Sequence, residues 1–428
     1  MRLLRLAPFA CALAFAQTPA PKPPPSEVAG IPVNYDEAKT GTYTLPDPLV
    51  TQSGQPVRDR RAWEQQRRPE IVKLFEENQY GRAPGRPAGL TFDVFDRGTP
   101  VFDGQALRKQ VTVYFSPDRQ GPHMDLVVYT PAAAKGPVPM VLTINFSPNS
   151  AIFADEGVKL GTMWNRDKKQ VPAERGRGLG RIDVKPILAA GFGVAGVYYG
   201  DIEPDFAGGA PLGVRKLYLK GSEPGPDEWG AISTWAWGLS RALDYLETDK
   251  NVDARRVALF GVSRLGKTVM WAGAHDQRFA AVIASCSGEG GAALSRRNYG
   301  ETVAHLMAPT RYPYQFAANW AKYASDPASA PMDANLLVSL IAPRPLLLQT
   351  GDTDLWSDPK GEFLAAVAAE PVYKLYGKDG LGTTEMPAAG QPILHTLSYF
   401  EHVGGHGSLP ADWTVYLQFL QQQLAAQH

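Results

Sequence analysis

Residues 256–267 read Arg-Val-Ala-Leu-Phe-Gly-Val-Ser-Arg-Leu-Gly-Lys, and this stretch decides the fold. The first five residues have the apolar, β-branched composition of a buried strand, and residues 265–274 have the spacing of a helix. Ser263 lies between them with a glycine on either side. A serine on a sharp turn between a strand and a helix is the pattern of a nucleophile elbow. The glycines are needed because a Cβ at their positions would collide with the neighbouring strand and helix.

The second glycine, Gly266, stands one place later than in the general G-x-S-x-G pattern, so the string here is G-x-S-x-x-G. The strand-to-helix context therefore carries more weight than the string itself. The alternative is that Ser263 only caps the following helix, since serine is a favoured N-cap residue. If Ser263 is a nucleophile, the backbone amide of Arg264 at the helix N-terminus would stabilise an oxyanion.

Apolar strands alternate with helices around this stretch, which predicts a mostly parallel sheet covered by helices on both faces. With the serine turn, this pattern predicts an α/β-hydrolase fold, a three-layer sandwich. The expected strands cover residues 138–146, 193–199, 256–260, 280–285 and 345–350. The expected helices cover residues 182–190, 229–246, 265–274, 361–369 and 412–426. Upstream we expect antiparallel strands at 90–95, 109–115 and 124–129, and a helical cap at 60–80 interrupted at Pro69.

Residues 296–331 do not alternate cleanly and are rich in aromatic side chains: Tyr299, Tyr312, Tyr314, Phe316, Trp320 and Tyr323. One interpretation is an insertion that lines a binding cleft. The other is ordinary core, since aromatic clusters are usually buried.

The composition sets limits on function. The chain has 428 residues, of which 44% are hydrophobic, and its formal net charge is zero. A chain of this length and composition can bury a large core, and we expect one catalytic domain over residues 34–428, with the insertion near 296–331. A neutral chain has no basic field for a polyanion or an anionic membrane, so we expect no nucleic-acid or membrane partner. We expect the protein to be a monomer. We also expect no cofactor or metal, because no H-E-x-x-H motif occurs and histidine and cysteine ligands are few.

The N-terminus resembles an export signal. Arg2 and Arg5 precede an apolar run at 6–15, and Ala14-Phe15-Ala16 is a small-residue cleavage pattern. We therefore expect residues 1–16 to be removed, residues 17–33 to form a Pro-rich linker, and the mature chain to be secreted or periplasmic. Such a chain would keep Cys286 as its single cysteine and would form no internal disulfide.

The expected base and acid follow Ser263 in the order serine, acid, histidine. His406 lies in the loop Gly404-Gly405-His406-Gly407, where glycines let an imidazole reach the end of the sheet. We prefer it over His402, whose alternative role is that of a supporting or surface residue.

The expected acid lies in the loop that follows the strand at 345–350. We choose Asp354, which would orient the imidazole and stabilise the imidazolium. Asp352 is the ordinary residue to cap a turn, and Asp358 to begin a helix at Pro359. Glu289 is a further alternative.

The string Gly261-Val262-Ser263-Arg264-Leu265-Gly266-Lys267 resembles the G-C-S-R-x-G-K signature of glucuronoyl esterases, carbohydrate esterase family fifteen, with valine in place of the usual cysteine. The similarity extends through the segments 341–345, 354–359 and 405–407, and it covers the chain roughly from residue 60 onward. It implies hydrolysis of the ester between a glucuronic acid on glucuronoxylan and a lignin alcohol.

The resemblance also implies roles for individual residues. Arg264 would help to stabilise the oxyanion, and Lys267 would bind sugar hydroxyls. Glu301 matches the family's sugar-binding glutamate and Trp356 its sugar-stacking tryptophan. Gln315 matches a further sugar-contacting glutamine.

One position departs from the family pattern. Many members carry the triad acid as a glutamate after the elbow helix, where Cys286 stands here. A buried thiol does not supply a stable anion, because burial raises its pKa. The acid is therefore expected at Asp354, as in some bacterial members that this chain resembles.

Two other functions remain open at this point. A general carboxylesterase or acetyl xylan esterase would share the triad but would need neither Lys267 nor Glu301. A catalytically inactive carbohydrate-binding protein could use the same scaffold, because a fold alone does not establish chemistry.

Overall fold

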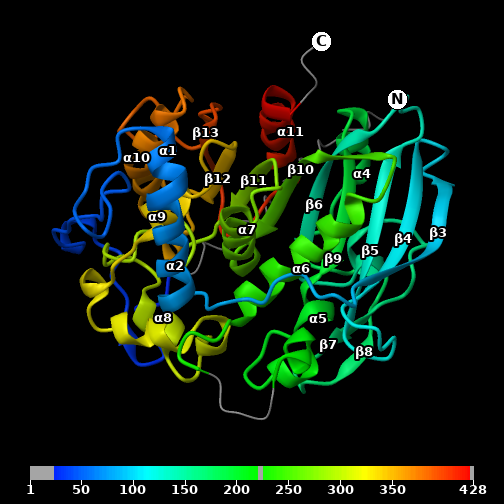
Figure 1. Cartoon of the computed structure of the whole chain (residues 1–428), viewed down its shortest axis with the longest axis horizontal. Coiled ribbons are helices and arrows are strands. Elements are labelled where there is room, and N and C mark those ends of the chain that lie inside the picture. The colour runs from blue at the N-terminus through cyan, green and yellow to red at the C-terminus, as the bar shows by residue number, and fades with distance from the viewer. Residues whose placement is uncertain (1–23, 220–224, 425–428) are drawn as a thin grey trace, which may run out of the picture.

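A nine-stranded sheet forms the centre of the computed structural model, which describes residues 24–219 and 225–424 (Figure 1). The strands lie in the order β13-β12-β11-β10-β6-β9-β5-β4-β3. The six from β13 to β9 pair in parallel, and β5, β4 and β3 add antiparallel pairs. Their bounds are β3 Thr91–Val101, β4 Ala106–Tyr114, β5 His123–Pro131, β6 Val138–Asn145, β9 Gly193–Tyr198, β10 Val252–Val262, β11 Ala281–Ser285, β12 Leu346–Gly351 and β13 Leu397–His402.

Helices cover both faces of this sheet. Along β10, Val257 and Leu259 point into one hydrophobic cluster, and Ala258 and Phe260 point into the other. The first cluster includes side chains of α6 (Ala231–Leu246), α7 (Arg264–His275), α9 (Ala334–Ser339) and α10 (Pro359–Leu375). The second includes α4 (Val184–Ala189) and α11 (Asp412–Leu424). This arrangement confirms the predicted three-layer α/β-hydrolase fold.

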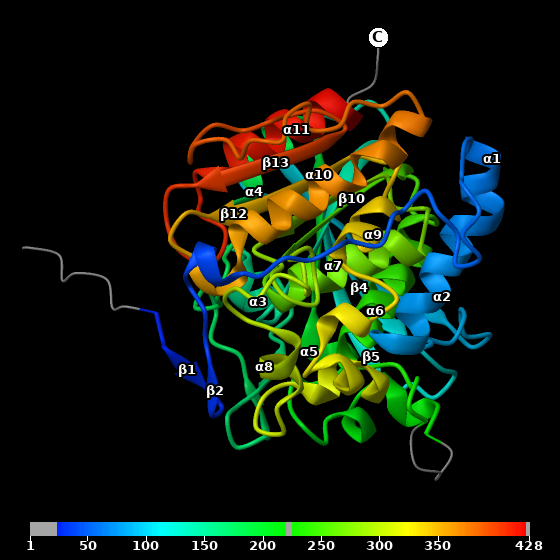
Figure 2. The ribbon, with the colours of Figure 1, turned by 90° about the vertical axis from the view of Figure 1, so that its left-hand side faces the viewer.

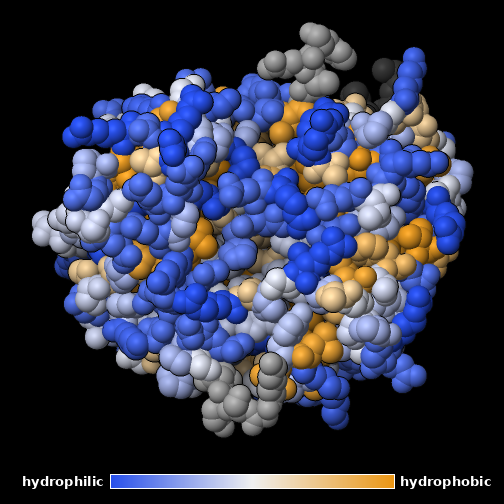
Figure 3. All heavy atoms as spheres, in the orientation of Figure 1, coloured by the Kyte–Doolittle hydropathy of each residue, from blue (hydrophilic) through white to orange (hydrophobic). Residues whose placement is uncertain are grey.

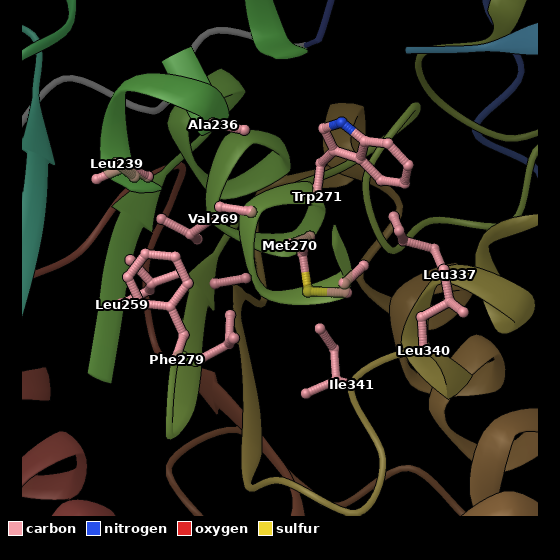
Figure 4. Packing of buried hydrophobic residues seen from close by; sticks show 14 of the residues in the cluster. Ala236, Leu239, Leu259, Val269, Met270, Trp271, Phe279, Leu337, Leu340 and Ile341 are labelled. Carbon is pink, nitrogen blue, oxygen red and sulfur yellow. The ribbon is translucent and has the colours of Figure 1, made fainter. Parts of the chain in front are cut away.

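Helix α7, which follows the serine turn, is buried over most of its length. Figure 4 shows its residues Val269, Met270 and Trp271 between Leu259 of β10, Leu239 of α6 and the segment around α9. All of these side chains are buried. The helix that follows Ser263 is thus fixed against the sheet over most of its length.

The N-terminal cap is helical as predicted, but its interruption has another form. It consists of α1 (Arg60–Ala62), a π-helical turn η2 (Trp63–Arg67) and α2 (Arg68–Asn78). Pro69 directly follows the π-helical turn, and the chain is helical on both sides of it, so the proline does not end the helix. The cap packs on α7, since the rings of Tyr80 and Trp271 stack with centroids 4.6 Å apart.

Two parts of the chain differ from the sequence prediction. Strand β13 was not predicted. Part of the expected linker forms a hairpin of β1 (Glu27–Val28) and β2 (Ile31–Pro32), seen in Figure 2, and the imidazole of His305 lies 3.3 Å from the carbonyl oxygen of Ile31. The segment 296–331 contains α8 (Val303–Met307), η5 (Pro313–Gln315), η6 (Ala318–Tyr323) and η7 (Pro327–Ser329). The predicted export signal at 1–16 lies outside the described residues.

The remaining elements are short: η1 (Glu37–Lys39), α3 (Asn149–Ile152), β7 (Thr162–Trp164), β8 (Gln170–Pro172), α5 (Tyr199–Ile202), η3 (Ala210–Leu212), η4 (Val214–Leu217) and η8 (Leu355–Ser357). The face in Figure 3 is mainly hydrophilic, with hydrophobic side chains in separate patches. Within the described ranges no helix has the length and apolar character needed to cross a membrane.

Candidate active site

Ser263 stands on a strained turn between β10 and α7. Its φ is 60° and its ψ is −128°, in a region that residues other than glycine rarely adopt. The backbone N–H of Ser263 donates to the carbonyl of Ser285 at the end of β11, over 2.8 Å. Although the residue occupies the N-cap position, its side chain makes no capping hydrogen bond. The hydroxyl is therefore not used to cap the helix.

The two glycines around the turn are explained by close backbone contacts. A Cβ on Gly261 would lie 2.3 Å from the carbonyl oxygen of Leu265, and one on Gly266 would lie 2.8 Å from that of Ser285. Both distances are shorter than any van der Waals contact, so each position requires glycine. The later second glycine thus follows from where α7 crosses the end of β11.

His406 and Asp354 meet on the loops that follow β13 and β12. The Nδ1 atom of His406 lies 2.7 Å from a carboxylate oxygen of Asp354 and 3.2 Å from the hydroxyl of Ser357. The two loops are joined by a backbone hydrogen bond from Thr353 to Gly404 over 3.1 Å. The imidazole is 43% exposed, whereas the carboxylate is buried. This is the contact by which an acid would orient a catalytic imidazole.

The other candidate acids are engaged elsewhere. Asp352 accepts the backbone N–H of Gly404 over 2.8 Å. Asp358 caps α10 and pairs with Arg297 over 3.0 Å. Glu289 accepts from the hydroxyl of Ser295 over 2.5 Å, and burial raises its pKa to about 8.

His402, the other candidate base, is the last residue of β13 and is buried. Its Nδ1 atom lies 2.7 Å from a carboxylate oxygen of Asp412, and its Nε2 lies 2.8 Å from the carbonyl oxygen of Gly405. Asp412 also accepts the N–H of Leu409 over 2.7 Å. This pair ties the loop that carries His406 to α11.

Cys286 lies directly beside the imidazole. Its sulfur accepts the N–H of Gly407 over 3.3 Å, and burial together with the charge of Asp354 raises the pKa of the thiol well above its ordinary value. Cys286, Asp354 and His406 form the one cluster in the described ranges whose side-chain ligand atoms lie within 4.8 Å of one another. The contact between Asp354 and His406 within this cluster is the one that acid–base chemistry requires.

A polar cavity of about 370 Å³ adjoins Ser263 and His406. Its lining contains the other residues singled out in the sequence: Arg264, Lys267, Glu301, Gln315 and Trp356. Arg311 and Tyr312 of the segment 296–331 complete it, while Phe316 and Trp320 of the same segment belong to the core. Tyr312 thus lines a cleft, as one interpretation of this aromatic segment held. Phe316 and Trp320 are ordinary core, as the other interpretation held.

Glu301 and Arg311 in this cavity are paired with each other, whereas Lys267 has no such partner among the described residues. Glu301 pairs with Arg311 over 2.8 Å, and the Arg311 guanidinium lies 5.6 Å from the centre of the Trp356 ring. Lys267 is 5% exposed, and its amine makes no hydrogen bond or ion pair with another described residue. Burial lowers the pKa of Lys267, which the nearby Glu301 opposes. A buried amine with unused donors is suited to bind oxygen atoms of a ligand.

Arg264 is held in place by a buried network. Its guanidinium pairs with Asp205 and lies 4.8 Å from the centre of the Tyr312 ring. Asp205 also accepts from the Gln315 amide over 2.7 Å and from the Tyr314 hydroxyl over 2.9 Å. As the first residue of α7, Arg264 has a backbone N–H without an intrahelical acceptor. Arg264 and Ser263 line the same cavity.

Sequence reasoning missed Asp205, Arg311 and Ser357, whereas Tyr312 was among the aromatic residues proposed to line a cleft. Asp205 lies in an irregular stretch rich in glycine and proline, and its partner Arg264 is 59 residues away. No periodic pattern marks such a residue, and only its contacts identify it. Ser357 follows Asp354 closely, so its place in the acid loop was the available signal.

The fungal glucuronyl esterase family model matches residues 223–377. The chain is 41% identical over 401 residues to a carbohydrate esterase, MZ0003, from an unknown prokaryotic organism, covering 91% of this chain and 92% of that protein. It is 26% identical over 386 residues to a 4-O-methyl-glucuronoyl methylesterase of Neurospora crassa, covering 86% and 84%.

Two solved structures are similar over nearly the whole chain. A glucuronoyl esterase from Solibacter usitatus superposes with a TM-score of 0.87 at 46% identity, covering 91% of this chain and all of that one. A structure described as a promiscuous esterase of carbohydrate esterase family 15 from a marine bacterial metagenome superposes with a TM-score of 0.85 at 40% identity, covering 92% and 100%.

Proposed function

The chain belongs to carbohydrate esterase family 15, the glucuronoyl esterases, and from this we propose that it hydrolyses esters of 4-O-methyl-glucuronic acid on glucuronoxylan. It is thus a carboxylic ester hydrolase. One observation carries the proposed substrate: the polar cavity that adjoins Ser263 and His406 contains the buried amine of Lys267, which has no partner in the described chain. A glucuronoyl group would supply the hydroxyl oxygens that this amine needs.

In the proposed mechanism the Ser263 hydroxyl attacks the ester carbonyl while His406 takes its proton. Asp354 stabilises the resulting imidazolium through the 2.7 Å contact to Nδ1. The backbone N–H and guanidinium of Arg264 stabilise the tetrahedral oxyanion. The imidazolium then gives its proton to the departing alcohol, which leaves a glucuronoyl-serine ester. A water molecule, deprotonated by His406, hydrolyses that ester and restores Ser263.

We further propose that Lys267, Glu301, Gln315 and Trp356 bind the sugar. Lys267 lies on α7 one turn after Ser263, and the rigid packing of α7 fixes the distance between nucleophile and amine. Glu301 and Gln315 carry acceptors and donors for hydroxyls, and Trp356 offers an aromatic face. This set distinguishes the proposed enzyme from a general carboxylesterase, which needs only the triad.

We also propose that residues 1–16 direct export and that the enzyme acts as a monomer outside the cytoplasm, with no nucleic-acid or membrane partner. A polymeric cell-wall substrate requires such a location. The packing of the described residues around one sheet supports a single catalytic domain over 34–428.

The test compares methyl glucuronate with phenyl acetate in the full chain and in Lys267→Met. We expect the variant to lose about tenfold or more in kcat/KM on the glucuronate through a higher KM. The sugar hydroxyls would lose their hydrogen bond to the charged amine, and such a loss costs about 1.5–3 kcal/mol. Phenyl acetate hydrolysis should stay within about twofold.

Stoichiometric labelling of Ser263 by a serine-directed phosphonate shows that the variant retains its site. Equal losses on both esters would favour a general carboxylesterase. Failure of the phosphonate to label the unmodified chain would favour a non-catalytic binding protein.

A further inference from the structure

A second cavity, separate from the active site, lies between α6, α7 and the segment that joins α2 to β3 (Figure 1). Its volume is about 190 Å³, and it shares no lining residue with the polar cavity at Ser263. Trp271 in its wall lies about 12 Å along the axis of α7 from Ser263. We call it the α6–α7 cavity, and the side chains used below are Arg86, Trp237, Arg241, Trp271, Asp276 and Arg278.

Arg241 of α6 is a buried cation in the wall of this cavity with unused donors. Its side chain is only 6% exposed, and its Nε donates to Asp244 over 2.6 Å. The two terminal nitrogens of the guanidinium make no hydrogen bond within the described ranges. Neither of them is completely buried, so we place both at the surface of the cavity. The guanidinium also lies 5.0 Å from the centre of the Trp237 ring, which restricts its movement.

The carboxylates near Arg241 already have partners. One oxygen of Asp244 accepts from Arg278 over 2.8 Å, and the other accepts from Arg241. Asp276 pairs with Arg278 over 2.7 Å. Each of the three guanidinium nitrogens of Arg278 is used in this way. The cavity therefore has more donors than acceptors, and the surplus is on Arg241.

Arg86 adds a second guanidinium at the rim. Its side chain is 54% exposed, and its Nε lies 3.5 Å from the same oxygen of Asp244 that Arg241 contacts. Arg86 makes no hydrogen bond in the part of the chain that the structure describes. Because both arginines approach one carboxylate oxygen, their guanidiniums must lie close together. One carboxylate oxygen is thus shared by two cations.

This arrangement is suited to a carboxylate on a small polar ligand. Guanidinium groups present parallel N–H donors that match the two oxygens of a carboxylate, and such charge-assisted bonds are stronger than those to neutral acceptors. Burial lowers the pKa of Arg241, so a bound anion would offset the cost of keeping its charge. Ser240, His275 and Gln277 also line the cavity and can bond to hydroxyls of the same ligand.

We propose that the α6–α7 cavity is a second binding site, which takes the free carboxylate of a uronic acid through Arg241 and Arg86. The choice of sugar rests on the proposed function, because glucuronoxylan would supply unesterified glucuronic acid. The site adds a place that holds the acidic polysaccharide without reacting with it. An esterified glucuronic acid has no such charge, so this site separates acid from ester.

The experiment follows the indole N–H signals of the full chain with 15N-labelled tryptophan by NMR. The Ser263→Ala variant is used so that esters are not hydrolysed. Trp237 and Trp271 report on the α6–α7 cavity, whereas Trp356 reports on the polar cavity. Glucuronate, methyl glucuronate and inorganic phosphate are titrated in separate series.

We expect glucuronate to shift the Trp237 signal with a Kd of about 1 mM, the affinity that a few charge-assisted hydrogen bonds give. Methyl glucuronate should bind there at least about tenfold more weakly, because it has no charge. Adding Arg241→Gln should weaken glucuronate binding about tenfold or more. Arg86→Ala, at the exposed rim, should weaken it about twofold to fivefold.

Arg255→Ala is the matched control, since it removes a surface arginine that is 90% exposed and lies outside this cavity. It should leave the affinity unchanged. With Ser263 intact, Arg241→Gln should keep kcat/KM on methyl glucuronate within about twofold, because Arg241 is not part of the active site. If Arg241→Gln fails to fold in a thermal unfolding check, the exposed Arg86→Ala still tests the proposal.

The inference would be overturned if the Trp237 signal showed no saturable shift up to about 10 mM glucuronate, ten times the expected Kd. Equal binding of the acid and its methyl ester, or unchanged affinity in both arginine variants, would also overturn it. Phosphate that bound more tightly than glucuronate would exclude a uronic acid as the ligand. Failure of the proposed function has a different signature, since the unmodified chain would then not hydrolyse methyl glucuronate, whatever the Trp237 signal shows.

Discussion

Replacing Asp354 by asparagine removes the negative charge beside the His406 ring while preserving the size of the side chain. The carboxylate lies 2.7 Å from Nδ1, and in the proposed mechanism the imidazole becomes positively charged as Ser263 attacks. The variant therefore loses an attraction that exists only during the reaction. It also offers an amide where the ring needs an acceptor, which favours the wrong tautomer.

The size of the effect follows from this geometry. Two unit charges at 2.7 Å attract by about 6 kcal/mol when the effective dielectric constant is about 20. The imidazole is 43% exposed, so water screens part of this attraction. If about two-thirds remains, the barrier rises by about 4 kcal/mol, and kcat falls about a thousandfold. KM should change little, because the charge pair is absent in the ground state.

The assay is hydrolysis of benzyl glucuronate at pH 7, with thermal unfolding as a check on the fold. Two matched controls are Asp352→Asn, which keeps an acceptor for Gly404, and Glu289→Gln, which changes a carboxyl bonded to Ser295. Both should stay within about tenfold of the unmodified chain. The reasoning would be refuted if Asp354→Asn kept a tenth of the activity, or if Glu289→Gln suffered the thousandfold loss instead.

Three further predictions concern stability and reactivity. Gly266→Ala should lower the free energy of unfolding by about 1–3 kcal/mol in urea denaturation, because its Cβ would meet the Ser285 carbonyl at 2.8 Å, whereas Gly136→Ala, with open space around it, should not. Burial raises the pKa of Glu362 from 4.5 to about 8, so the unfolded chain loses this proton first and stability falls as pH rises from 4.5 to 8. Glu362→Gln should make the urea midpoint less dependent on pH across that window; an unchanged slope would contradict this. Cys286 should resist iodoacetamide at pH 8 in the folded chain and react in urea, as mass spectrometry would detect, because burial keeps its thiol protonated.

The sequence was sufficient to predict the parts of the fold that depend on local pattern. The strand before Ser263 and the helix after it follow from apolar runs of the right period. Strand β13 (Leu397–His402) was missed because it follows an irregular segment, and its pairing with β12 is decided by tertiary contacts. The hairpin at Glu27–Val28 and Ile31–Pro32 was likewise invisible, since each strand has two residues.

The site could be predicted where chain order and loop composition restrict the choice. The glycine loop pointed to His406, and the segment after β12 pointed to Asp354; the structure places the two in contact, while their catalytic roles remain predictions. Asp205 and Arg311 could not be found in this way. Each has a role only through a partner brought near by the fold, Arg264 in one case and Glu301 in the other.

The position of Asp354 and His406 at the edge of the sheet has a consequence for inactivation by heat. Asp354 and His406 follow β12 and β13, which pair over six residues at one margin of the sheet, whereas Ser263 follows β10, two strands further in. Gentle warming that loosens this margin would move both partners as a single piece and would leave their mutual contact intact. The enzyme would then lose activity, while a proton NMR spectrum would still show the hydrogen bond between His406 and Asp354.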